Sequence, residues 1–578
     1  MGSSFEDAVA QMCGPGGRFE LTEADVRGVR LPVFAGAFNS VRTLIDMLRT
    51  QPPDDVFLVY EDERWTFAHL VAQIDALGAA LVDDYDVVPG TRVAIAMRNY
   101  PEWVVAYAAI VSIGAVAVCL NAWWTTDELD YGLRDSGTSV VLADAERIER
   151  MLPLLTPVVT GDEALPVRVL AVRTPVEAIP SGTPIDRWDD VVAPAVAAAR
   201  PMPDVDIDPD DDLMILYTSG TTGHPKGAVS THRGVVTALF AYACRSVVQA
   251  IVSAPEPGEE AKPPSPYPTA FILTVPLFHV TGLIPVMLGS VLGGNKLVIM
   301  YKWNPERALE LIERERVTTF VGVPTMSWDL LESPSFASTD TSSLVSVGGG
   351  GAPAPPELVK RIDSSFSRGR PSIGYGMTET NAYGPQNLAD DYVRKPTSAG
   401  RTVPVMQVAV LDLEGNVLPA GEQGEICFRG ANLFKGYWNN PDATRDTFTD
   451  DGWLRTGDLG RLDEEGFVYV EDRAKDIVIR AGENIATSEV EAAIYEHPSV
   501  YEAAVFGIPH ERLGEEVVAA VVVRAGHTID VADLQDHVRA RLASFKVPTR
   551  VVFFDEQLPR GASGKILKRQ LRDELPAV

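Results

Sequence analysis

Short apolar runs alternate with stretches of helical periodicity through the middle of the chain. Runs of this length, rich in Val, Leu, Ile and Phe, are typical of strands buried on both faces, and helices between them are typical of crossover connections. One helix is expected to begin at Asn304-Pro305, because Asn caps helices well and Pro is tolerated at the first helical position. The pattern predicts a parallel sheet covered by helices on both sides. The strand-like runs are residues 213–217, 271–275, 296–300, 318–321 and 344–347.

Residues 103–120 form a run of eighteen residues without a charge, which is long enough to cross a bilayer. Gly114 divides this run. Residues 115–120 have the composition of a buried strand, whereas the first half fits a short helix. We therefore predict a helix and a strand inside the core and no integral membrane span, which still allows peripheral contact with a membrane.

The sequence pattern changes after about residue 405, where turns expected at 413–416 and 463–466 separate short strands. This pattern predicts a β-rich section. From Arg473 onward, apolar runs and helical stretches predict a compact α+β domain of about a hundred residues. Two loops are expected at 204–212 and 254–269. The strands of the last domain are expected at 477–479, 500–506 and 517–523, and its helices near 488–496 and 531–542.

The chain of 578 residues is strongly acidic, with 50 Lys and Arg against 80 Asp and Glu, a formal net charge of −30. Such a charge argues against a protein that covers a nucleic-acid backbone, so any anionic ligand must meet local positive charge. The surplus lies in the first 472 residues, because residues 473–578 hold 14 basic and 16 acidic residues. The four cysteines, Cys13, Cys119, Cys244 and Cys427, have no disulfide-scaffold or metal-site spacing, and the first residues lack the features of a signal peptide. We expect a cytoplasmic protein.

Candidate chemistry is concentrated directly after the strand at 213–217. Residues 218–227 read Thr-Ser-Gly-Thr-Thr-Gly-His-Pro-Lys-Gly. The glycines let the backbone approach a ligand, hydroxyl and N–H groups can donate to phosphate oxygens, and Lys226 adds a cation. The loop is not a Walker A sequence, because Pro225 precedes the lysine and Gly227 follows it. It therefore indicates a phosphate-binding loop of another kind.

Together with this loop, a series of further motifs resembles the adenylate-forming superfamily of acyl-CoA synthetases, nonribosomal adenylation domains and firefly luciferase. The resemblance extends from about Trp65 to Leu571. It implies an α/β fold: a large N-terminal lobe of doubly covered α/β sheets plus a β-rich subdomain, with a small mobile α+β C-terminal lid domain. We accordingly expect an N-terminal extension over 1–40, a large AMP-binding domain over 41–473 and the lid over 474–578. The motifs are Pro276-Leu277-Phe278-His279, Gly350-Gly351-Ala352-Pro353, Tyr375-Gly376-Met377-Thr378-Glu379, Thr456-Gly457-Asp458, Arg473-Ala474-Lys475-Asp476, Gly482-Glu483-Asn484-Ile485, and Ser563-Gly564-Lys565 after Pro559-Arg560.

The resemblance implies two half-reactions that use ATP, Mg²⁺ and coenzyme A. A carboxylate first attacks the α-phosphate of ATP to form an acyl-adenylate and pyrophosphate, and the CoA thiol then displaces AMP. By resemblance, Lys565 is the catalytic lysine, Glu379 the Mg²⁺-associated carboxylate and Thr378 a phosphate contact. The remaining ATP and AMP contacts implied are Thr218, Ser219, Gly220, Thr221, Thr222, Gly223, Lys226, Gly351, Ala352, Pro353, Tyr375 and Gly376, with Asp458 and Arg473 at the ribose.

Other positions are assigned to the acid, to the hinge and to CoA. The resemblance places His279, Gly350 and Gly374 at the acyl substrate, Lys475 at the hinge, and Gly482 and Glu483 at the CoA tunnel. Ile373 departs from the family pattern, where a polar residue is frequent, so a side-chain contact to adenine from there is not expected. No general base for the thiol is identified.

Several branches of the superfamily fit less well. An amino-acid-activating domain would offer an acidic residue near His279, and fatty acyl-AMP ligases carry an insertion for which residues 456–473 have no room. We therefore expect an ATP-dependent carboxylic acid:CoA ligase, acting on a medium- or long-chain fatty acid. Aryl or other acids remain open, as does a non-catalytic nucleotide-binding relative. We expect a monomer or a homodimer that binds no nucleic acid.

Overall fold

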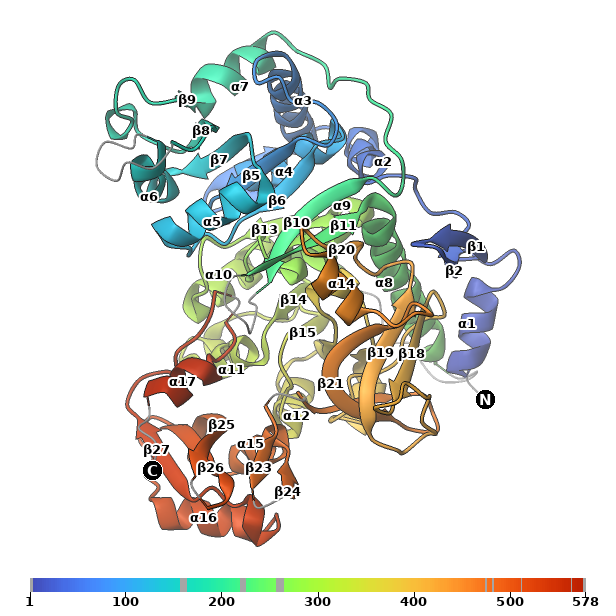
Figure 1. The fold of residues 1–578 in the computed structure, drawn as a ribbon, viewed down its shortest axis with the longest axis vertical. Helices are drawn as coiled ribbons and strands as arrows, with labels where there is room; N and C mark the ends of the chain where they lie inside the picture. The colour runs from blue at the N-terminus through green and yellow to red at the C-terminus, as the bar shows by residue number, and fades with distance from the viewer. Residues whose placement is uncertain are drawn as a thin grey trace.

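In the computed structural model, described residues are 4–155, 164–218, 225–255, 265–473, 476–480, 483–510, 512–562 and 564–574. A large lobe built on two eight-stranded sheets carries a smaller four-stranded sheet on one side and a separate C-terminal domain at its foot (Figure 1). The fold class expected from the sequence is therefore confirmed. An additional helix, α1 (Phe5–Cys13), and a hairpin of β1 (Leu21–Val26) and β2 (Val29–Phe34) precede the lobe.

The first large sheet is parallel over six strands and has an antiparallel edge formed by β11 and β20. Alternate residues of its strands face different cores. Ile95 packs in the core that contains α3 and α4, whereas Ala94 packs with α5 and α6. Helices therefore cover both faces of the sheet. The strands, in spatial order, are β20 (Gly436–Tyr437), β11 (Lys226–Thr231), β10 (Asp212–Thr218), β6 (Val116–Cys119), β5 (Arg92–Ala96), β7 (Val140–Asp144), β8 (Arg168–Val172) and β9 (Ile185–Arg187), and the helices are α3 (Phe67–Asp83), α4 (Pro101–Ser112), α5 (Thr126–Ser136), α6 (Ala145–Leu155) and α7 (Trp188–Ala197).

The second large sheet is parallel from β16 to β3 and ends in the antiparallel strands β17 and β4. The predicted strands at 271–275, 296–300 and 318–321 lie within it, with bounds shifted by one or two residues. The helix predicted at Asn304-Pro305 is confirmed, and Asn304 Oδ1 accepts the backbone N–H of Arg307 at 2.8 Å. The strands are β17 (Gln386–Leu388), β16 (Arg370–Gly374), β15 (Ser346–Gly350), β14 (Thr319–Gly322), β12 (Ala270–Leu273), β13 (Lys296–Ile299), β3 (Val56–Tyr60) and β4 (Glu63–Thr66), and the helices are α2 (Val41–Asp46), α9 (Gly289–Gly293), α10 (Pro305–Glu315), α11 (Pro324–Glu332), α12 (Pro356–Ser365) and α13 (Ala389–Arg394).

One predicted strand was placed too early. The run at 344–347 is replaced by β15, Ser346–Gly350, which includes three glycines that the prediction left out. Glycine is depleted in strands because it adds no packing, but here a Cβ on any of the three glycines would lie between 1.8 and 2.4 Å from the main chain of β14 or β16.

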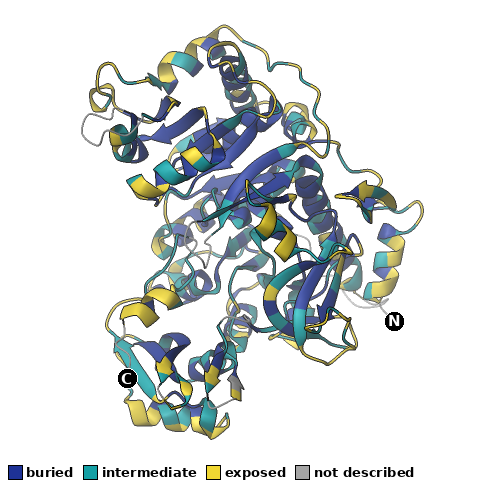
Figure 2. Cartoon of the chain, viewed as in Figure 1, coloured by how far each residue is buried: buried dark blue, intermediate teal, exposed yellow. Residues whose placement is uncertain are grey.

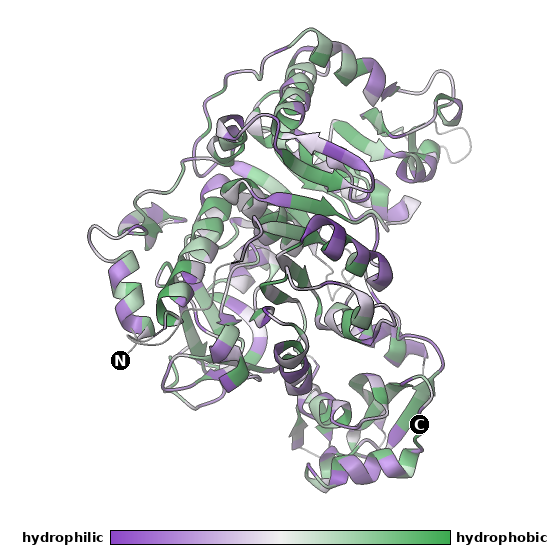
Figure 3. Cartoon of the chain, turned by 180° about the vertical axis from the view of Figure 1, so that it is seen from behind, coloured by the Kyte–Doolittle hydropathy of each residue, from purple (hydrophilic) through white to green (hydrophobic). Residues whose placement is uncertain are grey.

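The two large sheets share one continuous apolar core, in which α4 and α8 (His232–Val252) are embedded (Figures 2 and 3). All twelve residues of α4 are buried, and β6 follows, as predicted for residues 103–120. Among the described helices, α8 is the one whose length and composition would suffice to cross a membrane, and half of its apolar window is buried inside the protein.

Two β-rich parts complete the molecule. The antiparallel sheet β18-β19-β21-β22 corresponds to the predicted section after residue 405. In the C-terminal domain, here called the lid, alternate residues of β26 face two cores, one with α15 and α16 and one with α17. The prediction missed β27 and α17, and part of the loop expected at 254–269 lies outside the described residues. The elements are β18 (Met406–Leu411), β19 (Gly424–Gly430), α14 (Pro441–Thr447), β21 (Leu454–Leu462), β22 (Val468–Arg473), β23 (Val478–Arg480), β24 (Glu483–Ile485), α15 (Thr487–Tyr495), β25 (Val500–His510), β26 (Gly514–Val523), α16 (Val531–Arg539), β27 (Arg550–Phe554) and α17 (Lys568–Glu574).

Candidate active site

The proposed phosphate-binding loop joins β10 to β11 at the edge of the first sheet. Thr218 ends β10, and its hydroxyl donates to the carbonyl of Lys226, the first residue of β11, at 3.3 Å. The ammonium group of Lys226 lies 5.1 Å from the centre of the Tyr437 ring. The hairpin thus fixes both ends of the loop next to an aromatic face. The intervening predicted contacts, Ser219, Gly220, Thr221, Thr222 and Gly223, lie outside the described residues.

A buried carboxylate faces the same tyrosine. Thr378 and Glu379 lie in a 3₁₀ turn, η5 (Thr378–Thr380), and Glu379 is 6% exposed. The hydroxyl of Tyr437 donates to Glu379 Oε1 at 2.6 Å. Burial, with the neighbouring Glu379, raises the pKa of Tyr437, so that this phenol stays a neutral donor. Sequence reasoning missed Tyr437, because its role depends on β20 pairing with β11 and cannot be read from local spacing.

A second carboxylate is arranged in the same way. The hydroxyl of Tyr375 donates to Asp458 Oδ2 at 2.6 Å, and Asp458 is 8% exposed. Asp458 on β21 pairs directly with Arg473 at the end of β22, so the two predicted ribose contacts are neighbours across one ladder. Phe428 packs beside Tyr375, with ring centres 5.6 Å apart. The structure therefore brings Tyr375, a predicted nucleotide contact, next to the two predicted ribose contacts.

The floor between these groups is bare backbone, formed by the carboxyl ends of β14, β15 and β16. A Cβ atom on Gly349 would lie 1.8 Å from the carbonyl oxygen of Gly322, and one on Gly350 would lie 2.4 Å from that of Gly374. Gly351 adopts φ +86°, and Ala352 and Pro353 follow it. Side chains at Gly349 and Gly350 would collide with the neighbouring main chain, so the backbone stays bare there and a ligand can approach it closely. Gly376 is similarly crowded, because a Cβ atom there would lie 2.3 Å from the carbonyl oxygen of Ala382.

The lid places Lys565 against this floor. A Cβ on Gly351 would lie 3.2 Å from Lys565 Cε and 3.8 Å from its Nζ. The lysine and His279 line one small pocket together with Gly350 and Gly351. Gly374 does not line this pocket but pairs with Gly350 across the β15–β16 ladder. The other lining residues, which the sequence interpretation did not single out, are Val275, Thr281, Gly322 and Val323.

His279 is partly buried, and one side of it faces the pocket. Desolvation, together with the positive charge of Lys565, lowers the pKa of His279 to about 3. Its Nδ1 accepts the backbone N–H of Thr281 at 3.3 Å. The imidazole is therefore neutral at physiological pH and is unsuited to carry a positive charge toward an anionic substrate.

Asn99 fixes the segment that carries His279. Its side-chain amide donates to the carbonyls of Val275 and Met300 at 3.1 and 3.3 Å and accepts the N–H of Leu277 at 2.9 Å. The residue follows β5 of the first sheet, whereas its partners follow β12 and β13 of the second. One buried side chain thus ties the two sheets together beside the pocket.

The hinge and the CoA residues are less fully placed. Lys475 and Gly482 lie outside the described residues. Glu483 begins the edge strand β24, is exposed, and does not line the pocket that holds Lys565. Its role at a CoA tunnel stays a prediction.

The described residues contain no group of three or more His, Cys, Asp or Glu side chains arranged to hold a metal ion. Glu379 is a buried carboxylate that is linked through Tyr437 to Lys226 at the end of the phosphate loop. This donor set fits Mg²⁺, which typically binds one or two carboxylates together with substrate phosphate oxygens.

Comparison with known proteins agrees with this geometry. Residues 47–438 match the family model described as AMP-binding enzyme, and residues 489–565 match the AMP-binding enzyme C-terminal domain. The chain is 35% identical to the long-chain-fatty-acid–CoA ligase FadD13 of Mycobacterium tuberculosis, over 89% of this chain and 94% of that protein. It is 36% identical to feruloyl-CoA synthase of an Amycolatopsis species, over 88% and 93% respectively. The solved structure of o-succinylbenzoate CoA synthetase from Bacillus subtilis, in complex with its acyl-adenylate, is 29% identical with a TM-score of 0.73, covering 93% of this chain and 99% of that one.

Proposed function

The chain belongs to the AMP-binding enzyme family as an AMP-forming acid–CoA ligase, and from this premise we propose that it activates a medium- or long-chain fatty acid. The observation that carries the proposal is the position of Lys565, which the lid brings into a pocket walled by Val275 and Val323 beside the glycine floor. A cation that shares a small pocket with two valines and three glycines suits an acid whose carboxylate must meet the α-phosphate of ATP.

In the first step, a carboxylate oxygen attacks the α-phosphorus and the bond to pyrophosphate breaks. Charge builds on the phosphoryl oxygens, and Lys565 supplies a positive charge between acid and nucleotide. Glu379 would hold Mg²⁺, whose charge offsets that of the phosphates when it is bound. Tyr437 orients this carboxylate through its 2.6 Å hydrogen bond, and Asp458 would accept the ribose hydroxyls with Tyr375 steadying it.

In the second step, the CoA sulfur attacks the acyl carbon and AMP departs with the bonding electrons of the anhydride oxygen. The thiol must lose its proton on approach, since the thiolate is the nucleophile. His279 is neutral, but its Nδ1 already accepts a backbone N–H, so we assign it to the wall of the acyl pocket and not to proton transfer.

An aryl acid is the second candidate, because feruloyl-CoA synthase is as similar to this chain as the fatty-acid ligase is. The screen that separates the candidates incubates the protein with ATP, Mg²⁺, CoA and a panel of saturated fatty acids of increasing length, cinnamic acids and benzoic acids. Mass spectrometry then records acyl-AMP and acyl-CoA for each acid. We expect thioesters from octanoate to palmitate; a preference for hydroxycinnamates would establish the aryl alternative, and no product from any acid would contradict ligase activity on these classes.

A further inference from the structure

Helix α11 connects the reaction pocket with the lid. It follows β14 directly, so that Gly322 and Val323, which line the pocket, lead into its first turn. Thr325, Asp329 and Glu332 follow at spacings of four and three residues, which places them on one face of the helix. Each of these three side chains contacts a residue of the lid.

The contact nearest the pocket holds the lysine loop. Arg560 Nη1 donates to Thr325 Oγ1 at 3.0 Å and to the carbonyl of Gly564 at 2.7 Å. Gly564 has φ +84°, and a Cβ there would lie 3.0 Å from Val323 Cγ2. Glu502, which is 1% exposed, pairs with the same guanidinium from within the lid. The residue before Lys565 is therefore packed on the start of α11.

Two further contacts lie along the helix, away from the pocket. The hydroxyl of Tyr501 donates to Asp329 Oδ1, while the indole N–H of Trp303 donates to Asp329 Oδ2 at 2.7 Å. The guanidinium of Arg524 forms an ion pair with Glu332. Asp329 thus receives one donor from the lid and one from the large lobe.

Glu332 and the neighbouring Trp328 are shared between the domains in the same way. Arg361 of α12 lies 3.3 Å from Glu332 and 4.9 Å from the centre of the Trp328 ring, and Arg524 of the lid lies 5.2 Å from that ring. One arginine from each domain therefore contacts the same carboxylate and the same ring. This arrangement offers a matched pair of substitutions.

We propose that Asp329 and Glu332, with their lid partners Tyr501 and Arg524, are positioning residues for the adenylate-forming step. None of the four lines the pocket, so they act through Lys565 by favouring the lid orientation that places this lysine at Gly351. The inference rests on the proposed function and on the mobile lid and hinge that the resemblance implies, with the lid leaving this orientation for the thioester step. These four side chains, here called the clamp, are thereby assigned to the adenylate-forming half-reaction and not to the thioester-forming one.

The test compares Arg524→Gln with Arg361→Gln. Adenylation is measured by ATP–pyrophosphate exchange with the acid that the screen selects, and thioester formation by single turnover of the synthetic acyl-adenylate with CoA. Since a partly buried charge-assisted contact contributes modestly, we expect Arg524→Gln to slow adenylation about three- to tenfold. The same variant should leave the thioester step unchanged or faster. Arg361→Gln should not change the ratio of the two rates.

Tyr501→Phe, which removes one hydroxyl and no charge, serves as the second variant in case Arg524→Gln folds poorly. It should give the same split between the half-reactions, with an unchanged thermal midpoint. Equal loss of both steps in either lid variant, or the same split in Arg361→Gln, would overturn the clamp. Absence of exchange in the unmodified enzyme with every acid would instead contradict the proposed function, so the two failures are distinct.

Discussion

Two β-rich parts are attached to the large lobe, and they are attached in different ways. The sheet β18-β19-β21-β22 is joined to the lobe by main-chain bonds, because the N–H of Ala399 donates to the carbonyl of Val468 at 2.8 Å and the N–H of Val468 donates to that of Gly400 at 2.9 Å. The lid has no strand paired with a strand of the lobe among the residues that the structure describes. The chain enters the lid directly after β22, and the contacts between the lid and α11 are made by side chains.

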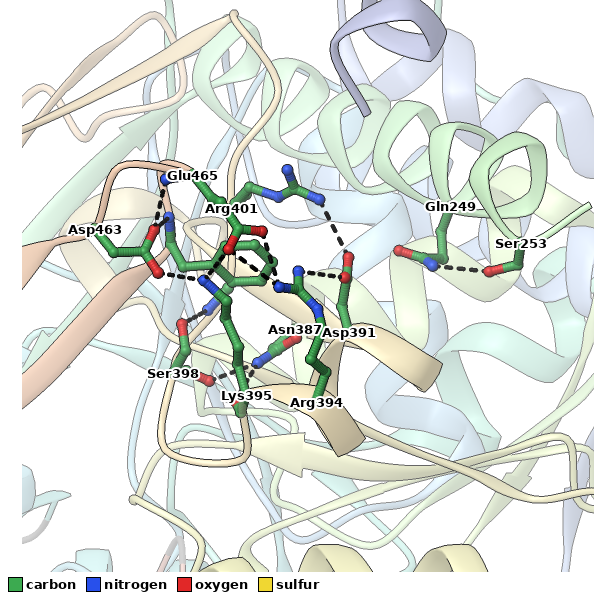
Figure 4. Close-up of polar contacts among 12 residues, drawn as sticks. Gln249, Ser253, Asn387, Asp391, Arg394, Lys395, Ser398, Arg401, Asp463 and Glu465 are labelled. Atoms are coloured by element: carbon green, nitrogen blue, oxygen red, sulfur yellow. Dashed lines mark hydrogen bonds and ion pairs between the residues drawn. The ribbon is translucent and has the colours of Figure 1, made fainter. Parts of the chain in front are cut away.

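Charged groups reinforce the first attachment. Lys395, whose side chain is 14% exposed, pairs with Asp463 and lies 2.8 Å from Glu465, both in the turn before β22 (Figure 4). The amide of Asn387 donates to the carbonyl of Ser398 at 2.9 Å. On the proposed mechanism, this difference has a functional reason: Asp458 on β21 would stay at the nucleotide throughout the reaction, whereas Lys565 would be needed for only one step.

The largest effect should follow from removing the lysine that the lid delivers. Lys565→Ala should reduce ATP–pyrophosphate exchange by about 10²- to 10³-fold, because a cation is lost where charge develops. Thioester formation from preformed acyl-adenylate should stay within about threefold, since this lysine serves the first step. Lys568→Ala is the matched control, because Lys568 Nζ pairs with Glu491 inside the lid at 2.7 Å. Equal losses in both half-reactions would remove Lys565 from its assigned role.

Acid should lower the free energy of unfolding of the large lobe, because this lobe contains a buried histidine. His232, at the start of α8, is buried, and desolvation lowers its pKa to about 4, while its Nδ1 accepts the N–H of Val41 at 3.1 Å. The unfolded chain, with a His pKa of about 6.5, binds this proton more readily, so stability is complete above pH 6.5 and falls as the pH drops toward 4. The loss should reach about 3 kcal/mol for this group.

Tryptophan fluorescence can follow this loss in the large lobe alone, because all nine tryptophans precede residue 454. Urea midpoints measured between pH 7 and 4 should fall less steeply for His232→Asn, whose amide oxygen takes the position of Nδ1 and can still accept from Val41. The same pH slope in both proteins would show that another group governs the transition.

A smaller effect is expected from loosening the four-stranded sheet. Asp463→Asn should lower the free energy of unfolding by about 2 kcal/mol, because Lys395 loses the charge of one partner in a largely buried site. Glu465→Gln should cost less than about 1 kcal/mol, since the Glu465 side chain is 52% exposed. Urea denaturation measures both. Unlike the lid variants, Asp463→Asn should leave the ratio of the two half-reactions unchanged, and a selective loss of adenylation would contradict the contrast between the two attachments.

The sequence predicts those features that depend on local pattern. Apolar runs locate β10, β12 and β13, and the Asn304-Pro305 pair locates the start of α10. The end of β15 could not be predicted in this way, because its glycines are required by the neighbouring strands and not by their own propensity. Motifs identify Glu379 and Asp458 as candidates.

The tyrosines that orient these two carboxylates come from distant parts of the chain. Tyr437 is 58 residues from Glu379, and Tyr375 is 83 residues from Asp458. Pairings of this kind depend on how β20 and β21 are placed in their sheets. The contacts of Arg524 and Tyr501 with α11 were missed for the same reason, since a single arginine or tyrosine carries no signal in the sequence for its partner in another domain.

The double contacts of Asp329 and Glu332 also affect how fast the enzyme can turn over. If the lid leaves α11 for the thioester step, as the proposed mechanism requires, Asp329 would keep the indole N–H of Trp303 and Glu332 would keep the guanidinium of Arg361. Both carboxylates are only partly buried even with the lid in place, so release of the lid would leave no unpaired buried charge. The clamp can therefore favour the adenylate-forming orientation of the lid and still release the lid in every catalytic cycle.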